Sequence, residues 1–157
     1  MLYAIAANAR VIPSVVDGLT LVKRKVLYSG LLRKPSMEAM KVCEMVGHVS
    51  ELTGYRHRVG HLIKPIIAMA RTGVGTCNIN LLEPTRGIFG TRNRGASAVA
   101  SDPEYLCTQV NKVTRMIFLE KDQHLLSYRS AEGRLVEFDL FFPNCSYDAS
   151  LLTELQA

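Results

Sequence analysis

The chain of 157 residues has few of the features that mark specialised classes of protein. Its four cysteines stand far apart and form no Cys-x-x-Cys pair, which argues against a structural zinc site and suits free thiols in a reducing, intracellular compartment. No apolar run approaches the roughly 20 residues that span a membrane. The apolar N-terminus has no basic leader, so we expect a helix of the mature protein there and not a signal peptide. A single globular domain remains, with ordinary fractions of hydrophobic (48%) and charged (21%) residues.

Positive charge is unevenly distributed along the chain. The formal net charge of +5 divides into +7 for residues 1–71, +2 for residues 72–115 and −4 for residues 116–157. A chain that is basic over its first three quarters and acidic at its end can present one positive face to a polyanion such as nucleic acid. Lysine and arginine also serve simply to solvate helices, so the composition leaves both interpretations open.

The first half of the chain has the apolar spacing of helices. Apolar residues recur at helical intervals in three segments, 18–34, 36–52 and 61–71. Ser36, which follows Pro35, is expected to cap the second helix, with Met40 inside it. Pro65 either kinks the third helix or marks its start.

Glycine and proline interrupt the chain after residue 72. Five glycines and two prolines within 73–103 break any long helix and predict short strands joined by loops, with 93–101 as a loop tip. Asp102 and Pro103 have the pattern of a helix opening. Residues 105–118 are ambiguous, because the apolar spacing fits a helix throughout, while Tyr105–Thr108 fits equally well as a short strand before one.

A β-hairpin is predicted at 125–142, where two β-prone runs flank Ser-Ala-Glu-Gly. Helices followed by a small set of strands predict an α+β fold, mainly helical, with a small antiparallel sheet in a winged-helix arrangement.

Four short segments carry residue types suited to phosphate chemistry. They are "IPSVVDGLTLVKRKVLY" at 12–28, "GYRHRVG" at 54–60, "IFGTRNRG" at 88–95 and "EYLCT" at 104–108. The first three gather basic side chains, and the third does so on a glycine-rich loop whose backbone can approach a ligand closely. The fourth supplies a tyrosine. Separately each is weak evidence, because a basic run is usually a solvated helix face and a lone tyrosine is usually packing.

Taken in order, these segments resemble the DNA breakage-reunion core of type IIA DNA topoisomerases. "IPSVVDGLTLVKRKVLY", "SELTGYRH", "NINLLEPTRGIFGTR" and "EYLCTQVNKVTRMIF" follow the family's order of motifs with small differences in length. The resemblance spans about residues 3–143 and is closer to the eukaryotic and viral enzymes than to gyrase. It implies a CAP-like winged-helix domain over residues 1–143. The acidic tail, 144–157, resembles nothing in the family.

The resemblance implies a covalent step on DNA. Tyr105 matches the tyrosine that attacks a backbone phosphate, which gives a 5′-phosphotyrosyl link and a free 3′-hydroxyl. A phenol with a pKa of about 10 needs a proton acceptor or a nearby positive charge at neutral pH. His57 matches the second histidine of a Tyr-His-His-Gly turn and is expected to hydrogen bond the phenol. Arg24 matches the arginine that steadies the scissile phosphate through its planar fork.

Further basic residues are expected to clamp the DNA backbone without reading its sequence, so binding should depend strongly on salt. These residues are Lys23, Lys25, Arg56, Arg58, Arg92 and Arg94. The complete enzyme implied is an ATP-dependent type II topoisomerase that works as a homodimer on duplex DNA, in the nucleus or a viral or host DNA compartment. Its Mg²⁺ and ATP are expected to bind outside this chain, on metal-binding (TOPRIM-type) and ATPase portions supplied in cis or in trans. The sequence lacks the acidic Glu-Gly-Asp and Asp-x-Asp cluster of the metal site.

The sequence departs from the family pattern near the expected nucleophile. Glu104 stands where the family usually has an arginine, so an anion replaces a cation beside the negative charge that develops on the phosphorane. In a partly desolvated site this exchange is expected to raise the activation free energy by an amount on the order of several kcal/mol. Arg56, Arg58 and Val59 alter the histidine turn, and Pro65 interrupts a continuous helix. Two alternatives follow: a truncated or diverged module that binds duplex DNA without cleaving it, and a winged helix that contacts protein instead of DNA.

Overall fold

The computed structural model describes residues 4, 7–8, 11–13, 17–34, 39–55, 57–72, 79–90, 102–119, 128–131 and 134–138. Near the N-terminus, Ala4, Ala7, Asn8 and Val11 have helical backbone. The N–H of Ile12 donates to the carbonyl of Asn8 at 2.9 Å, which agrees with the helix predicted there. The tail at 144–157 and the loop tip at 93–101 lie outside the described residues.

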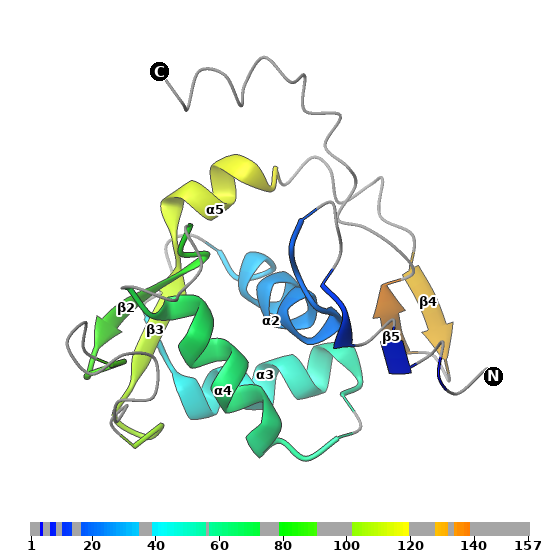
Figure 1. Cartoon of the computed structure of the whole chain (residues 1–157), viewed down its shortest axis with the longest axis horizontal. Coiled ribbons are helices and arrows are strands. Elements are labelled where there is room, and N and C mark those ends of the chain that lie inside the picture. The colour runs from blue at the N-terminus through cyan, green and yellow to red at the C-terminus, as the bar shows by residue number, and fades with distance from the viewer. Residues whose placement is uncertain are drawn as a thin grey trace.

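Three helices packed on one another form the centre of the molecule (Figure 1). They are α2 (Leu21–Leu31), α3 (Val42–Thr53) and α4 (Gly60–Ala70). Their facing sides bury a set of apolar side chains that are at most 2% exposed: Val26, Leu27, Val42, Val46, Val49, Leu62, Ile66, Met69 and Ala70. Full burial of such a side chain contributes about 1.5–3 kcal/mol, so this core fixes how the three helices sit together.

A tight turn leads into α2. Gly18 adopts the left-handed backbone conformation with φ of 66°, and the Asp17 carboxylate accepts the N–H of Leu19 at 2.9 Å. The helix is shorter than predicted. Leu19 precedes the helix but is buried, whereas Leu32 follows it and is 40% exposed. The apolar spacing predicted over residues 18–34 is therefore not buried as far as the end of that segment.

The second helix was predicted to begin too early in the sequence. A short strand, β1 (Met40–Lys41), precedes α3, so Met40 lies in a strand and not in the helix, while Ser36 lies outside the described residues. Met40 pairs across the sheet with Thr108, a partner that helical spacing alone cannot reveal. The Glu44 carboxylate accepts the N–H of Lys41 at 3.3 Å and so supports the first turn of α3.

Pro65 lies inside α4 and neither starts nor ends it. The helix opens with two tight turns, in which the N–H of His61 donates to the Arg58 carbonyl at 2.9 Å and the N–H of Leu62 donates to the Val59 carbonyl at 3.0 Å. Proline has no N–H, so α4 forgoes one internal hydrogen bond there. Burial of Leu62 and its neighbours against α2 and α3 favours a continuous helix despite that loss.

A small antiparallel sheet lies on one side of the helices, with strand order β1-β3-β2 (Figure 1). β2 (Leu82–Arg86) and β3 (Cys107–Val110) pair with a register shift at Pro84. The helix opening predicted at Asp102 is wrong, because residues 103–105 form a turn. The alternative, a short strand predicted to start at Tyr105, is confirmed as β3, which starts at Cys107. The Asn111 side chain then accepts the N–H of Val113 at 3.0 Å and caps α5 (Lys112–Ile117).

The predicted hairpin is confirmed as β4 (Tyr128–Ala131) paired with β5 (Arg134–Phe138). It lies across the helices from the three-stranded sheet and contacts α3 (Figure 1). The architecture is therefore α+β and mainly helical with small antiparallel sheets, as predicted. In the part of the chain that the structure describes, no helix has the length and apolar character needed to cross a membrane.

Candidate nucleic-acid and phosphate-transfer site

Tyr105 closes the turn that precedes β3, and its side chain is 70% exposed. Its N–H donates to the Asp102 carbonyl at 2.9 Å. The next residue, Leu106, is fully buried, and its carbonyl accepts the N–H of Val42, the first residue of α3, at 2.8 Å. The backbone on either side of Tyr105 is thus held by hydrogen bonds and core packing while the phenol faces solvent, an arrangement that suits a nucleophile for a large substrate.

Gly87 lets the end of β2 approach Tyr105 closely. It has φ of 89°, and a Cβ at this position would lie 2.9 Å from the Tyr105 carbonyl oxygen and 2.7 Å from a methyl carbon of Leu106. Only glycine combines that backbone conformation with that approach. Sequence reasoning did not single out Gly87, and its place in a glycine-rich stretch was the only available signal.

The turn that carries Tyr105 also carries two carboxylates, those of Asp102 and Glu104. Partial burial raises the pKa of the Cys43 thiol, and the nearby carboxylates of Glu104 and Asp102 raise it further because they disfavour the thiolate. Both acids belong to the turn that carries Tyr105, so that turn lies within electrostatic reach of the start of α3. The anion predicted beside the nucleophile is therefore present on the same short turn.

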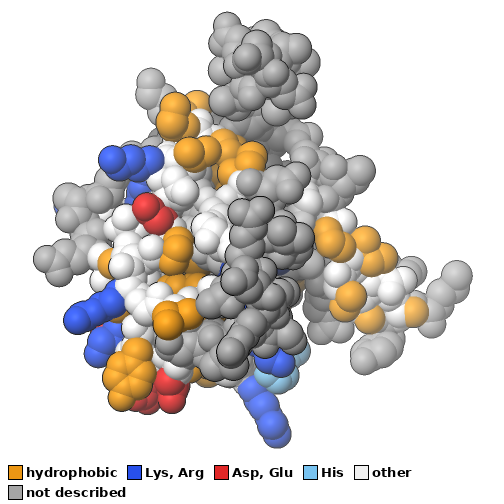
Figure 2. Space-filling model, turned by 60° about the vertical axis from the view of Figure 1, so that its left-hand side comes forward, with side chains coloured by type: hydrophobic (Ala, Val, Ile, Leu, Met, Phe, Trp, Pro, Cys, Tyr) orange, Lys and Arg blue, Asp and Glu red, His pale blue; other side chains and the backbone are white. Residues whose placement is uncertain are grey.

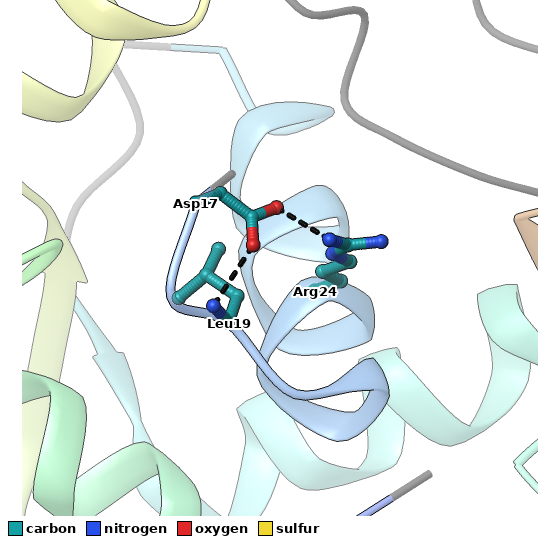
Figure 3. A network of polar contacts seen from close by, with 3 residues as sticks. All are labelled: Asp17, Leu19 and Arg24. Carbon is teal, nitrogen blue, oxygen red and sulfur yellow. Dashed lines mark hydrogen bonds and ion pairs between the residues drawn. The ribbon is translucent and has the colours of Figure 1, made fainter. Parts of the chain in front are cut away.

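Arg24 is held by an ion pair in the first turn of α2. Its guanidinium lies 2.8 Å from the carboxylate of Asp17, and the two side chains are 11% and 13% exposed. The other carboxylate oxygen of Asp17 accepts the N–H of Leu19, so one side chain shapes the turn and orients the arginine (Figure 3). The sequence alone does not reveal this link between the turn at Asp17 and Arg24.

Lys25 points inward. It is 7% exposed, and its ammonium donates to the carbonyl of Thr53 at 3.5 Å, at the C-terminal end of α3. A cation there complements the negative end of the helix dipole. Lys23, one of the other predicted clamps on this helix, is half-buried. The geometry gives Lys25 a structural role between α2 and α3, so we do not count it among the residues available to DNA.

His57 lies in the exposed connection between α3 and α4. Its ring packs edge-on against Tyr55, with centroids 5.5 Å apart and planes inclined by 72°. Burial raises the pKa of the Tyr55 phenol above its ordinary value of 10.0, so Tyr55 stays neutral and acts as a packing partner. Arg58, beside it, is exposed. Of the remaining predicted clamps, Arg56, Arg92 and Arg94 lie outside the described residues.

Helix α3 separates Tyr105 from the other predicted catalytic residues. Leu106, the residue after Tyr105, accepts the N–H of the first residue of α3. Lys25, the residue after Arg24, instead bonds the carbonyl of the last residue of α3. His57 follows that same end in the chain. A helix of 12 residues rises about 16–18 Å from end to end. One copy of the chain therefore has Tyr105 near one end of α3, and Arg24 and His57 near the other.

Charge on the face shown in Figure 2 is mixed. Lys and Arg side chains occur there in separate groups with acidic side chains among them, and histidine lies beside basic side chains at the lower edge. Among the described residues, no group of three His, Cys, Asp or Glu side chains could hold a metal ion. This part of the chain does not fit a Mg²⁺ site, and no step proposed below is routed through one.

Comparison with known proteins places this geometry in a family. The family model for the A subunit of DNA gyrase/topoisomerase IV matches residues 10–145. DNA topoisomerase 2 of Penicillium chrysogenum is 41% identical over 143 residues, 91% of this chain and 9% of that protein. The protein named "DNA topoisomerase 2, mitochondrial" of Dictyostelium discoideum is 40% identical over 141 residues, 90% of this chain and 11% of that protein.

A solved structure supports the same assignment. The crystal structure of the Plasmodium falciparum topoisomerase II DNA-binding, cleavage and re-ligation domain has a TM-score of 0.80 and 38% identity, over 89% of this chain and 19% of that chain. The chain spans about a tenth of the length of the two curated relatives. The resemblance predicted from the order of motifs is confirmed: this chain belongs to the family of DNA gyrase and topoisomerase IV A subunits, within which it is similar to the eukaryotic type II DNA topoisomerases.

Proposed function

We propose that this chain is a DNA-gate portion of an ATP-dependent type II DNA topoisomerase. In this role it binds duplex DNA and forms a transient 5′-phosphotyrosyl link during double-strand passage. The observation that carries the proposal is Tyr105, 70% exposed on a backbone anchored to the core, in a chain of this family. The working unit is the domain at 1–143, with 144–157 as a tail, located in the nucleus or another compartment that holds DNA.

The proposed reaction is a reversible transesterification. The phenolic oxygen of Tyr105 attacks the phosphorus of a backbone phosphodiester, the bond from phosphorus to the 3′ oxygen breaks, and the phenolic proton leaves to an acceptor. The departing 3′ oxygen takes up a proton and becomes the 3′-hydroxyl, and religation reverses each change. We assign His57 to the hydrogen bond on the phenol, and Arg24 to the non-bridging phosphate oxygens, which match the planar fork of a guanidinium.

The distance along α3 supports a homodimer. Helix α3 is about 16–18 Å long, with Tyr105 near its first residue and Arg24 and His57 near its last. We infer that the three side chains meet on one phosphate when two copies combine. Tyr105 of one copy would then meet Arg24 and His57 of the second. A twofold pair would contain two such composite sites, one for each strand of a duplex.

The DNA-binding surface proposed here uses the remaining cations. Lys23 and Arg58 lie on described elements, and Arg56, Arg92 and Arg94 complete the set predicted from the sequence. Such residues contact phosphates and not bases, so affinity should fall with salt and show little sequence preference. Mg²⁺ and ATP would act on metal-binding and ATPase portions of the enzyme that this chain does not contain, supplied in cis or in trans.

A covalent-adduct experiment with mixed chains tests both the nucleophile and the composite site. The chain is combined with a separately made topoisomerase metal-binding domain, magnesium and end-labelled duplex DNA, then denatured with detergent to reveal DNA-linked protein. Tyr105→Phe alone and Arg24→Ala alone should each give almost no adduct. A mixture of the two variants should restore it, because a mixed dimer keeps one intact site made from the tyrosine of one copy and the arginine of the other. Failure of the mixture, while unchanged protein reacts, contradicts the composite site.

The second candidate is a module that binds duplex DNA without cleaving it. The carboxylates of Glu104 and Asp102 on the Tyr105 turn favour it, because they oppose the negative charge that develops on the phosphate. Glu104→Arg is the discriminating variant. An adduct that forms only with Glu104→Arg would show an intact site disabled by one charge. No adduct with any variant, together with salt-dependent DNA binding, would establish the binding module.

A further inference from the structure

A pocket of 160 Å³ lies at the end of α2 opposite to Arg24. The C-terminal end of α2, the segment from β1 into α3, and the junction between β3 and α5 form its walls. Four of its lining residues are cationic, namely Arg33, Lys34, Lys112 and Arg115. Among the described residues that line it, none is acidic, so this described lining carries a net positive charge.

Arg115 gives the pocket a fixed cationic side. Its guanidinium donates to the Arg33 carbonyl at 2.7 Å and to the Leu31 carbonyl at 3.5 Å, bonds that tie α5 to the last turn of α2. The guanidinium has five N–H donors, so these two bonds leave donors for a ligand. They also cover carbonyls at the negative end of the α2 dipole, which would otherwise repel an anion.

Polar side chains also line the pocket. Ser29 is fully buried, and its hydroxyl lies 2.7 Å from Nδ1 of His48. Through that bond Ser29 orients the imidazole, and the described residues form no hydrogen bond to its Nε2. Gln109, which lines the pocket, donates its side-chain amide to the Glu83 carboxylate at 3.2 Å, and Glu83 itself does not line the pocket.

We propose that this pocket binds a phosphate group. A phosphate has several acceptor oxygens and a negative charge, which match a guanidinium fork and flexible ammonium groups through charge-assisted hydrogen bonds. The pocket volume accommodates one such group, whether free phosphate or one phosphate of a nucleic-acid backbone. The proposal does not require cleavage by Tyr105, because the pocket belongs to the other end of α2 and shares no residue with the proposed catalytic set.

The test uses inorganic phosphate and pyrophosphate as probes on the 157-residue chain, with binding measured by titration calorimetry. The variant Lys34→Gln with Lys112→Gln removes two pocket charges. Its matched control, Lys41→Gln with Lys64→Gln, removes two exposed lysines outside the pocket. The pocket variant should bind phosphate at least about tenfold more weakly than the control.

A duplex oligonucleotide distinguishes the two sources of the phosphate. If the DNA backbone supplies it, the pocket variant loses more DNA affinity than the control variant, and inorganic phosphate competes with the duplex. If free phosphate is the ligand, both variants lose DNA affinity equally while only the pocket variant loses phosphate binding.

Absence of saturable phosphate binding at millimolar concentration, or equal binding by the two double variants, overturns the proposal. If the pocket variant does not fold, NMR amide spectra of the unchanged chain, recorded with and without phosphate, test the proposal instead. Shifts on adding phosphate that are confined to Ser29, His48 and Lys112 support the pocket, and shifts spread over the basic surface contradict it.

Discussion

Substitution of Gly87 by alanine should perturb the Tyr105 turn and the stability of the fold together. Gly87 has φ of 89°, a region where a residue with a Cβ costs about 1–2 kcal/mol. The new Cβ would also lie 2.9 Å from the Tyr105 carbonyl oxygen and 2.7 Å from a side-chain carbon of Leu106. The shifts of side chain and backbone that relieve such overpacking lower the free energy of unfolding by about 1–3 kcal/mol. The two effects together predict a loss of about 2–5 kcal/mol in the free energy of unfolding, a large part of the stability of a typical domain.

Gly47 provides the matched control. It lies exposed in α3, and a Cβ there would meet nothing within 4 Å, so Gly47→Ala should stabilise the chain by about 0.5–1 kcal/mol through helix propensity alone. Urea unfolding of both variants measures the free energies. In the adduct assay, Gly87→Ala should also lower the yield, because relief of the contact moves the peptide of Tyr105. An effect of Gly87→Ala below about 0.5 kcal/mol would refute the reasoning.

Four further predictions concern single charges. Lys25→Gln should lower the free energy of unfolding by about 1–3 kcal/mol through the loss of its buried bond, with no change in the salt dependence of DNA binding. Lys23→Gln should change the free energy of unfolding by less than about 0.5 kcal/mol, but should reduce the slope of log affinity against log salt concentration by about 0.9. Equal slopes for the two variants would contradict the inward placement of Lys25. Asp17→Asn keeps a hydrogen-bond acceptor for the turn but removes the ion pair with Arg24. It should lower the free energy of unfolding, measured in urea, by about 2–4 kcal/mol, a value between those of exposed and buried ion pairs. A loss below about 0.5 kcal/mol would contradict a stabilising role for this ion pair. Glu104→Gln should speed alkylation of Cys43 at a fixed, mildly alkaline pH. Loss of the carboxylate lowers the raised pKa of the thiol and so increases the fraction present as thiolate. An unchanged alkylation rate would place Glu104 away from Cys43.

The features that the sequence alone determined are local or depend on order along the chain. Helical spacing predicted the body of α2, α3 and α4, and β-prone runs around Ser-Ala-Glu-Gly predicted the pair β4 and β5. Family membership followed from the order of four motifs, which needs no knowledge of contacts. Each of these features depends on neighbours a few residues apart, where backbone propensity and turn chemistry act.

Tertiary structure decided which faces and ends meet. Met40 joined a strand because Thr108 pairs with it, and Lys25 turned inward because the end of α3 lies beneath it. Neither partner is near in sequence, so periodicity could not identify it.

The same limit applies to the sites. The sequence placed Tyr105 and His57 in one predicted catalytic set, yet they lie near opposite ends of α3, which makes a second copy part of the proposal. Conversely, Arg33 and Arg115 stand 82 positions apart and share one pocket wall only because a guanidinium caps the end of α2. Burial and distance depend on how helices pack, and packing is a property of the whole core and not of any one segment.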